Sequence, residues 1–290
     1  MDVAWMLKLS AGVVMSAAVA MVPLTGCETV APSTTVTATP TPCPGGLPGP
    51  AMVEALVPPS GSYCIDATEV TQDQYNDFLI DAADNPPNQD SFCSFNDSFV
   101  PRNNTDSCNP DSFDPVERAD RPVTCVDWCD AAAYCSWAGK RLCGRVGGGG
   151  LQNSNSEPWD FSKSQWYNAC SDSGQFRYPY GDSYREDVCN GADAGYGRTL
   201  PVTTDSDESG CHGVYPPYRD LFAMSGNVAE WEDGCGASQG DSDFCYVRGG
   251  SYEGDDDGSY TDKLACLGAI TGYFRSDNRN PFIGFRCCLD

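Results

Sequence analysis

Residues 122–142, PVTCVDWCDAAAYCSWAGKRL, carry the strongest structural signal in this chain. Asp127 can cap a helix, because its carboxylate can accept hydrogen bonds from the first backbone N–H groups of the helix. Helical spacing then places one set of side chains on a single face: Ala131, Tyr134, Cys135 and Ala138. Gly139 ends the pattern, as glycine commonly does after a helix. The stretch therefore predicts a short helix whose buried face includes a cysteine.

Two capping boxes predict further helices. Thr71 and Gln74 form the first box, and apolar side chains follow at helical spacing: Tyr75, Phe78 and Leu79. Ser162 and Gln165 form the second box, which leads into Trp166, Ala169 and Cys170. Both boxes predict helices that bury one face.

Three segments predict strands: 63–66, 246–248 and 283–288. The rest of the domain is rich in Gly, Asn, Asp and Pro. We therefore expect an α+β domain with long loops. A loop-rich domain of this size needs additional constraints, and disulfides and calcium are the usual ones.

The amino terminus predicts export. Residues 9–22 are apolar but too few to span a bilayer and be retained, and they follow Lys8. Residues 1–26 therefore predict a secretory signal peptide. The end of this segment, LTGC at 24–27, resembles the bacterial lipoprotein box, which implies cleavage before Cys27 and lipid on its sulfur and new amino terminus. The alternative is an ordinary signal with a chance cysteine.

These features predict a lipid-anchored protein of the bacterial cell envelope, with the outer membrane or the cell surface favoured. Residues 27–50 form a linker rich in Thr and Pro, which favour an extended spacer. Residues 51–290 are enough for one large domain. The formal net charge is −24, with 41 acidic and 17 basic residues. Such a surface repels phosphate backbones, so nucleic acid is excluded as a partner.

The cysteines predict a disulfide framework. Setting Cys27 aside from the 17 cysteines leaves an even number in an exported chain. A zinc ribbon or histidine-rich iron site is disfavoured, because no C-x-x-C pair occurs and His212 is the single histidine. Adjacent Cys287 and Cys288 favour two different partners. Cys43 can pin the linker to the domain. Sequence proximity alone favours three pairs: Cys93–Cys108, Cys189–Cys211 and Cys235–Cys245.

Six motifs in the same order resemble the formylglycine-generating enzyme, or sulfatase-modifying factor, domain family. The resemblance covers about residues 51–290, and its motifs are CIDATEVTQDQYNDF at 64–78, residues 122–142, YPYG at 178–181, MSGNVAEW at 224–231, RGGSY at 248–252 and GFRC at 284–287. Each motif alone is weak evidence, but six in sequence are strong evidence.

The resemblance implies a single loop-rich α+β domain of the C-type-lectin-like kind, held together by disulfides and calcium. By position it implies the disulfides Cys135–Cys287 and Cys170–Cys266. It also implies a calcium site formed by carbonyl oxygens and one carboxylate: Ser225, Gly226, Val228 and Glu230. Oxygen ligands on a tight loop suit this ion. A second, weaker calcium site would use Asn190 and Gly191. The alternative role for Glu230 is a hydrogen bond within its own turn.

The resemblance does not extend to the chemistry of the enzyme. The family's enzyme binds copper through two cysteines that follow its RGGS motif, and thiolates suit copper(I). Here Gly254 and Ser259 occupy the two positions. Copper is therefore not expected, and no catalytic residue is assigned.

Three functions follow from this pattern. The first is a catalytically silent scaffold that binds a protein or a glycan. The second is a formylglycine-generating oxidase that acts on a sulfatase-type cysteine through a relocated thiol pair. The third is an oxidoreductase subunit that completes the active site of another chain. The first is favoured, because the structural motifs are retained without the two cysteines.

Overall fold

The computed structural model describes residues 42–105, 107–109, 112–203, 210–253, 264–268, 271–276 and 280–290. Cys27, the signal segment and most of the linker lie outside the described residues, as do Gly254 and Ser259. Within the described residues, no helix has the length and apolar character needed to cross a membrane.

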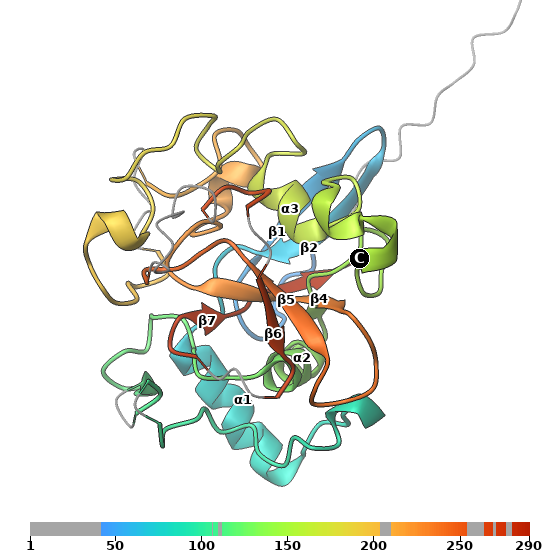
Figure 1. Cartoon of the computed structure of the whole chain (residues 1–290), viewed down its shortest axis with the longest axis vertical. Coiled ribbons are helices and arrows are strands. Elements are labelled where there is room, and N and C mark those ends of the chain that lie inside the picture. Colours follow the sequence, from blue (N-terminus) through green and yellow to red (C-terminus); the bar gives the residue numbers. More distant parts are fainter. Residues whose placement is uncertain are drawn as a thin grey trace, which may run out of the picture. The chain divides into compact units, whose positions relative to one another are not determined.

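The described strands form two four-stranded sheets (Figure 1). One has the order β1-β2-β8-β3 and consists of Met52–Val57, Gly61–Asp66, Cys287–Leu289 and Arg141–Leu142. Its paired strands are antiparallel. The other has the order β6-β5-β4-β7 and consists of Thr271–Phe274, Phe244–Arg248, Ala229–Cys235 and Ile283–Gly284. In this second sheet β7 runs parallel to β4.

The predicted strands 63–66 and 246–248 lie within β2 and β5. The prediction of a single strand over 283–288 is wrong, because Phe285 and Arg286 interrupt it. Both of these side chains are fully buried. The interruption gives the carboxyl-terminal segment one strand in each sheet, so this segment links the two sheets.

The helices α1 and α2 confirm two sequence predictions. In α1, Gln72–Asp84, the Thr71 hydroxyl accepts from Gln74 N, and the Gln74 side chain accepts from Thr71 N. In α2, Trp128–Trp137, Asp127 caps the helix and forms the same reciprocal arrangement with Asp130. Gly139, with φ +72°, follows the end of α2, and glycine adopts this left-handed conformation at little cost.

The helix α3, Gln165–Cys170, begins two residues later than a cap at Ser162 requires. Ser164 is the actual cap, because its hydroxyl accepts from Tyr167 N. The N–H and hydroxyl of Ser162 instead donate to Asp160 Oδ1. Short 3-10 helices complete the described elements: η1 Ser91–Cys93, η3 Asn153–Asn155, η4 Glu157–Trp159, η5 Ala192–Ala194 and η6 Tyr218–Asp220.

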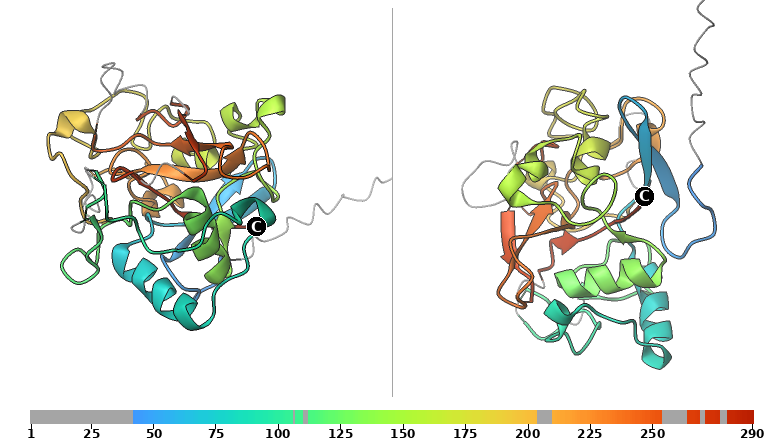
Figure 2. Two further views of the ribbon diagram at one scale, coloured as in Figure 1. Left: turned by 60° about the horizontal axis from the view of Figure 1, so that its bottom comes forward. Right: turned by 90° about the vertical axis from the view of Figure 1, so that its right-hand side faces the viewer.

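The helices α1 and α2 lie on one side of the sheets, and α3 lies on the other side (Figures 1 and 2). An aromatic cluster packs α1 against α2. The Tyr75 and Tyr134 rings stack at 5.6 Å, and the Phe285 ring meets both edge-on. Aromatic pairs in these geometries add to the stabilisation from burial. This cluster therefore joins the two long helices to the segment that links the sheets.

Eight disulfides engage every cysteine from Cys43 to Cys288: Cys43–Cys64, Cys93–Cys129, Cys108–Cys125, Cys135–Cys287, Cys143–Cys288, Cys170–Cys266, Cys189–Cys211 and Cys235–Cys245. Both bridges that the resemblance implies are present. Neighbouring residues of a strand point to opposite faces, so Cys287 and Cys288 in β8 reach different partners, as expected. Cys43 ties the end of the linker to β2.

The predicted pair Cys93–Cys108 is wrong. Cys93 ends η1, which lies against the start of α2, as the ring contact between Phe92 and Trp128 at 5.8 Å shows. This packing brings Cys93 to Cys129. Cys108 pairs instead with Cys125. Both disulfides depend on how the elements pack in space, and distance along the sequence does not reveal this packing.

Candidate functional site

The motif residues meet inside the molecule, where Glu230 and Arg286 form a buried ion pair. Arg286 Nε lies 2.9 and 2.8 Å from the two oxygens of Glu230, and Arg286 Nη2 lies 2.7 Å from Oε1. Trp166 Nε1 donates to Glu230 Oε2 at 2.8 Å. Bidentate arginine–carboxylate pairs are among the strongest polar contacts in proteins.

The remaining donors of Arg286 bind backbone carbonyls. Arg286 Nη1 donates to the Asp66 carbonyl at 3.1 Å, and Nη2 donates to the carbonyls of Phe222 and Ala223 at 2.9 and 3.3 Å. A buried guanidinium needs such partners, because leaving its donors without acceptors is costly. Arg286 therefore holds three chain segments besides its own.

Two further ion pairs between motif residues are fully buried. Lys140 Nζ lies 2.6 Å from Asp66 Oδ1, and the backbone N–H of Cys287 donates to the other oxygen of Asp66. Arg248 Nε lies 2.8 Å from Glu232 Oε2. Each pair joins one motif segment, or its flank, to another. The motifs that carry the family resemblance therefore form a structural framework.

Glu69 is a buried carboxyl group beside this framework. Its Oε1 accepts from Asn227 Nδ2 at 3.0 Å, and its Oε2 has no hydrogen-bond partner among the described residues. Burial raises the pKa of Glu69 to about 8, against the attraction of Arg286. The nearby charge of Glu230 contributes to this raised pKa. Both effects favour the protonated form of Glu69, which avoids a second buried negative charge.

The structure brings the two predicted calcium segments into contact. Asn227 N donates to the Asn190 carbonyl at 2.8 Å, and the Asn190 side-chain amide donates to Asn227 Oδ1 at 3.0 Å. At Gly226, with φ +73°, a Cβ would lie 2.6 Å from the Asn190 carbonyl oxygen, so glycine is needed there. Gly191 follows Asn190 at the start of η5.

The predicted ligands fit calcium unequally. The carboxylate of Glu230 does not fit well, because both oxygens already accept from Arg286 and a second cation would be repelled. The other predicted ligands are the backbone carbonyl oxygens of Ser225, Gly226 and Val228, and Ser225 and Val228 are buried. Asn190 fits better, because its side-chain oxygen is buried and no described residue donates to it.

The segment before the two replaced cysteine positions is held in place by its backbone. Tyr252 N donates to the Asn227 carbonyl at 3.1 Å, and the Ser251 hydroxyl donates to the Glu253 carbonyl at 2.8 Å. Gly254 and Ser259 themselves lie outside the described residues. Since the cysteines from Cys43 to Cys288 are all in disulfides, none of them supplies a thiolate to this segment.

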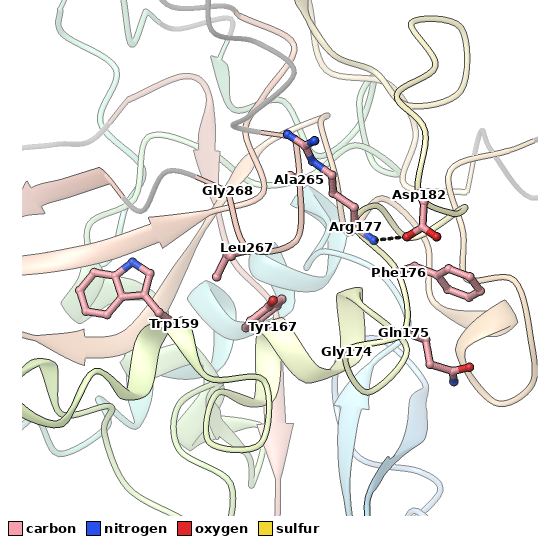
Figure 3. Close-up of a pocket in the computed structure, with 10 residues that line it drawn as sticks. All are labelled: Trp159, Tyr167, Gly174, Gln175, Phe176, Arg177, Asp182, Ala265, Leu267 and Gly268. Atoms are coloured by element: carbon pink, nitrogen blue, oxygen red, sulfur yellow. Dashed lines mark hydrogen bonds between the residues drawn. The ribbon is translucent and has the colours of Figure 1, made fainter. Parts of the chain in front are cut away.

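A pocket of about 550 Å³ is lined by residues from Trp159 to Asp182 and from Ala265 to Gly268 (Figure 3). Figure 3 shows Trp159 at one end, Arg177 and Asp182 at the other, and Tyr167 and Leu267 between them. Trp159 is 47% exposed and Leu267 is 46% exposed. The disulfide Cys170–Cys266 joins the two walls, because Cys170 ends α3 and Cys266 precedes Leu267.

Sequence reasoning did not identify this pocket. Trp159 lies in the short helix η4, where no periodic pattern marks it. The one relevant signal in the sequence was the implied disulfide Cys170–Cys266, because it brings residues 265–268 to α3.

The profile of the sulfatase-modifying factor enzyme 1-like domain matches residues 57–290. The chain belongs to this family. The buried ion pairs between motif residues therefore belong to a sulfatase-modifying factor domain. The crystal structure of CarF matches with a TM-score of 0.50 and 20% identity, and covers 84% of this chain and 95% of that one. This match shows the fold alone.

Curated relatives of this sulfatase-modifying factor domain include proteins named as an enzyme and proteins named as an inactive form. Inactive C-alpha-formylglycine-generating enzyme 2 of Bos taurus is 30% identical over 181 residues, which are 59% of this chain and 51% of the relative. Formylglycine-generating enzyme of Mus musculus is 28% identical over 190 residues, which are 60% of this chain and 46% of the relative. The chain spans about half the length of these relatives.

We predict that Glu230→Gln destabilises the domain, because it leaves Arg286 buried without its counter-ion. Breaking a buried pair in this way costs about 3–5 kcal/mol in free energy of unfolding. Denaturant unfolding with the disulfides intact measures this loss. Glu117→Gln removes an exposed carboxylate and is the control, with a change of no more than about 0.5 kcal/mol.

The same measurement with a chelator separates the ion pair with Arg286 from calcium coordination as the role of Glu230. The ion pair predicts an equal loss with and without the chelator. A loss that disappears when calcium is removed would instead make Glu230 a calcium ligand.

Proposed function

We propose that this chain is a catalytically silent member of its family, used for binding. The observation that carries this proposal is the pairing of all sixteen cysteines from Cys43 to Cys288. Copper(I) chemistry of the family's kind needs two thiolates, and a disulfide offers none. Gly254 and Ser259 at the expected positions add to this argument. The inactive bovine relative is in keeping with it.

The proposal includes export and lipid anchoring at the bacterial cell envelope. Its support is the apolar run at 9–22 and the small residue before Cys27. A spacer rich in Thr and Pro then suits a domain held away from a membrane. The mass of the mature amino terminus tests this part, because lipid on Cys27 adds a diacylglycerol and an acyl chain.

We propose that the pocket in Figure 3 binds a glycan. Its exposed Trp159 ring and Leu267 offer an apolar surface for the C–H face of a sugar, and aromatic side chains supply such surface at little entropic cost. Arg177 and Asp182 stand at the other end, where they can bond hydroxyl groups. An apolar lining with a few polar groups is typical of small-ligand sites. The C-type-lectin-like fold class that the resemblance implies is part of this proposal.

We predict that Trp159→Ala weakens glycan binding. Removing the ring deletes the apolar wall, so affinity falls by at least about ten-fold. Binding of the wild-type domain to an oligosaccharide panel is measured first, and the sugar retained there is then titrated into the variant. Phe244→Ala is the control, because Phe244 is a 52% exposed aromatic outside the pocket. No sugar retained by the wild type, or equal binding by Trp159→Ala, would refute the glycan site.

We further propose that calcium binds at Asn190, with the Gly191 carbonyl beside it. The support is the buried Asn190 oxygen to which no described residue donates. Calcium accepts side-chain and backbone carbonyl oxygens of this kind.

We predict that calcium raises the melting temperature of the wild type but not of Asn190→Leu. A ligand present at 100 times its dissociation constant adds about 2.7 kcal/mol to the free energy of unfolding. Thermal unfolding is recorded with calcium and, as control, with magnesium at equal concentration. Equal melting temperatures with both ions in the wild type would contradict the proposed site.

A further inference from the structure

Arginine side chains gather at one cavity of this acidic protein. The chain has 17 basic residues and a formal net charge of −24. Three of the 17 line a single cavity of about 250 Å³: Arg118, Arg121 and Arg198. Tyr252 and Pro281 complete its rim. A local concentration of positive charge in a protein with a negative net charge indicates a site that attracts an anion.

Backbone contacts fix the arginines in this arrangement. Gln72 N, at the start of α1, donates to the Arg121 carbonyl at 2.9 Å, and Arg121 N donates to the Arg118 carbonyl at 3.1 Å. Arg121 Nη1 donates to the Thr199 carbonyl at 2.8 Å, and the Asn190 side chain donates to the Arg198 carbonyl. The loops that carry Arg121 and Arg198 are therefore anchored to each other and to the domain.

The arginines also repel one another. Burial lowers the pKa of Arg121, and the charges of Arg198 and Arg118 lower it further, while Asp120 acts in the opposite direction. An anion between Arg121 and Arg198 would offset this repulsion. Guanidinium groups present a planar fork of donors that matches carboxylate, phosphate and sulfate oxygens.

We propose that this cavity binds the oxyanion group, sulfate, phosphate or carboxylate, of a small acidic ligand. Arg121 and Arg198 supply the charge. A second cavity shares part of the same wall, including Arg118, Tyr252 and Gly197, and has a volume of about 480 Å³. It offers room for the rest of the ligand. Glu253 lines this second cavity and excludes a second anionic group there.

The oxyanion site is independent of the glycan pocket. The residues that line the two places differ, and Trp159 lines the pocket in Figure 3 but not the arginine cavity. Tyr252 places the oxyanion site beside the segment in which Gly254 and Ser259 replace the family's cysteines. A negative glycan experiment therefore does not bear on the oxyanion site. A negative anion titration likewise does not bear on the glycan pocket.

Calorimetric titration with sodium sulfate, sodium phosphate and sodium acetate tests the proposal, at an ionic strength held constant with sodium chloride. We expect saturable binding of at least one of these anions by the wild type. Arg198→Gln and Arg121→Gln should each weaken it by at least about ten-fold, because each removes a charge-assisted contact. Arg185→Gln is the matched control, since Arg185 is an exposed arginine paired with Asp187 away from the cavity. Its affinity should change by less than about two-fold.

The three anions distinguish the sources of the group. Binding of sulfate or phosphate alone supports a tetrahedral oxyanion, and binding of acetate supports a carboxylate. Arg198 is exposed, so Arg198→Gln decides the question if Arg121→Gln does not fold. No saturable binding by the wild type, or an equal loss in Arg185→Gln, overturns the proposal.

Discussion

The bidentate ion pair between Arg286 and Glu230 is the interaction on which the rest of this structure depends. Arg286 lies between β7 and β8, which belong to different sheets. Its guanidinium binds Glu230 of β4 in one sheet and the carbonyl of Asp66 at the end of β2 in the other. A charge buried this deeply is tolerated only when its donors are satisfied. The two sheets must therefore close around it, and the interrupted strand at 285–286 is the local consequence.

The residues that build the family's scaffold are different from the two residues that carry the family's copper chemistry. The motif residues at Asp66, Glu230, Arg248 and Arg286 bond to the interior and do not line the pocket in Figure 3. Gly254 and Ser259 lie outside the described residues and outside the six motifs. The ion pairs of the framework use neither of the family's two copper-binding positions, so the six motifs by themselves do not establish the family's reaction.

Local chemistry in the sequence predicted local structure well. The boxes at Thr71 and Asp127 need only neighbouring residues, and both are present. Ser162 had a closer acceptor in Asp160, which the box pattern does not include. The partner of Cys93 depends on how η1 packs against α2, and the partner of Glu230 lies 56 residues away at Arg286. Trp159 and the arginine cavity arise from loops whose meeting place depends on tertiary packing, so no periodic pattern reveals them.

Alkylation of the denatured, unreduced protein followed by peptide mass spectrometry shows whether this scaffold holds a thiol pair for the family's chemistry. We predict no alkylated cysteine between Cys43 and Cys288, and the eight disulfides as linked peptides. Two alkylated cysteines in that range would contradict this prediction, because they could hold copper(I) in the manner of an active oxidase.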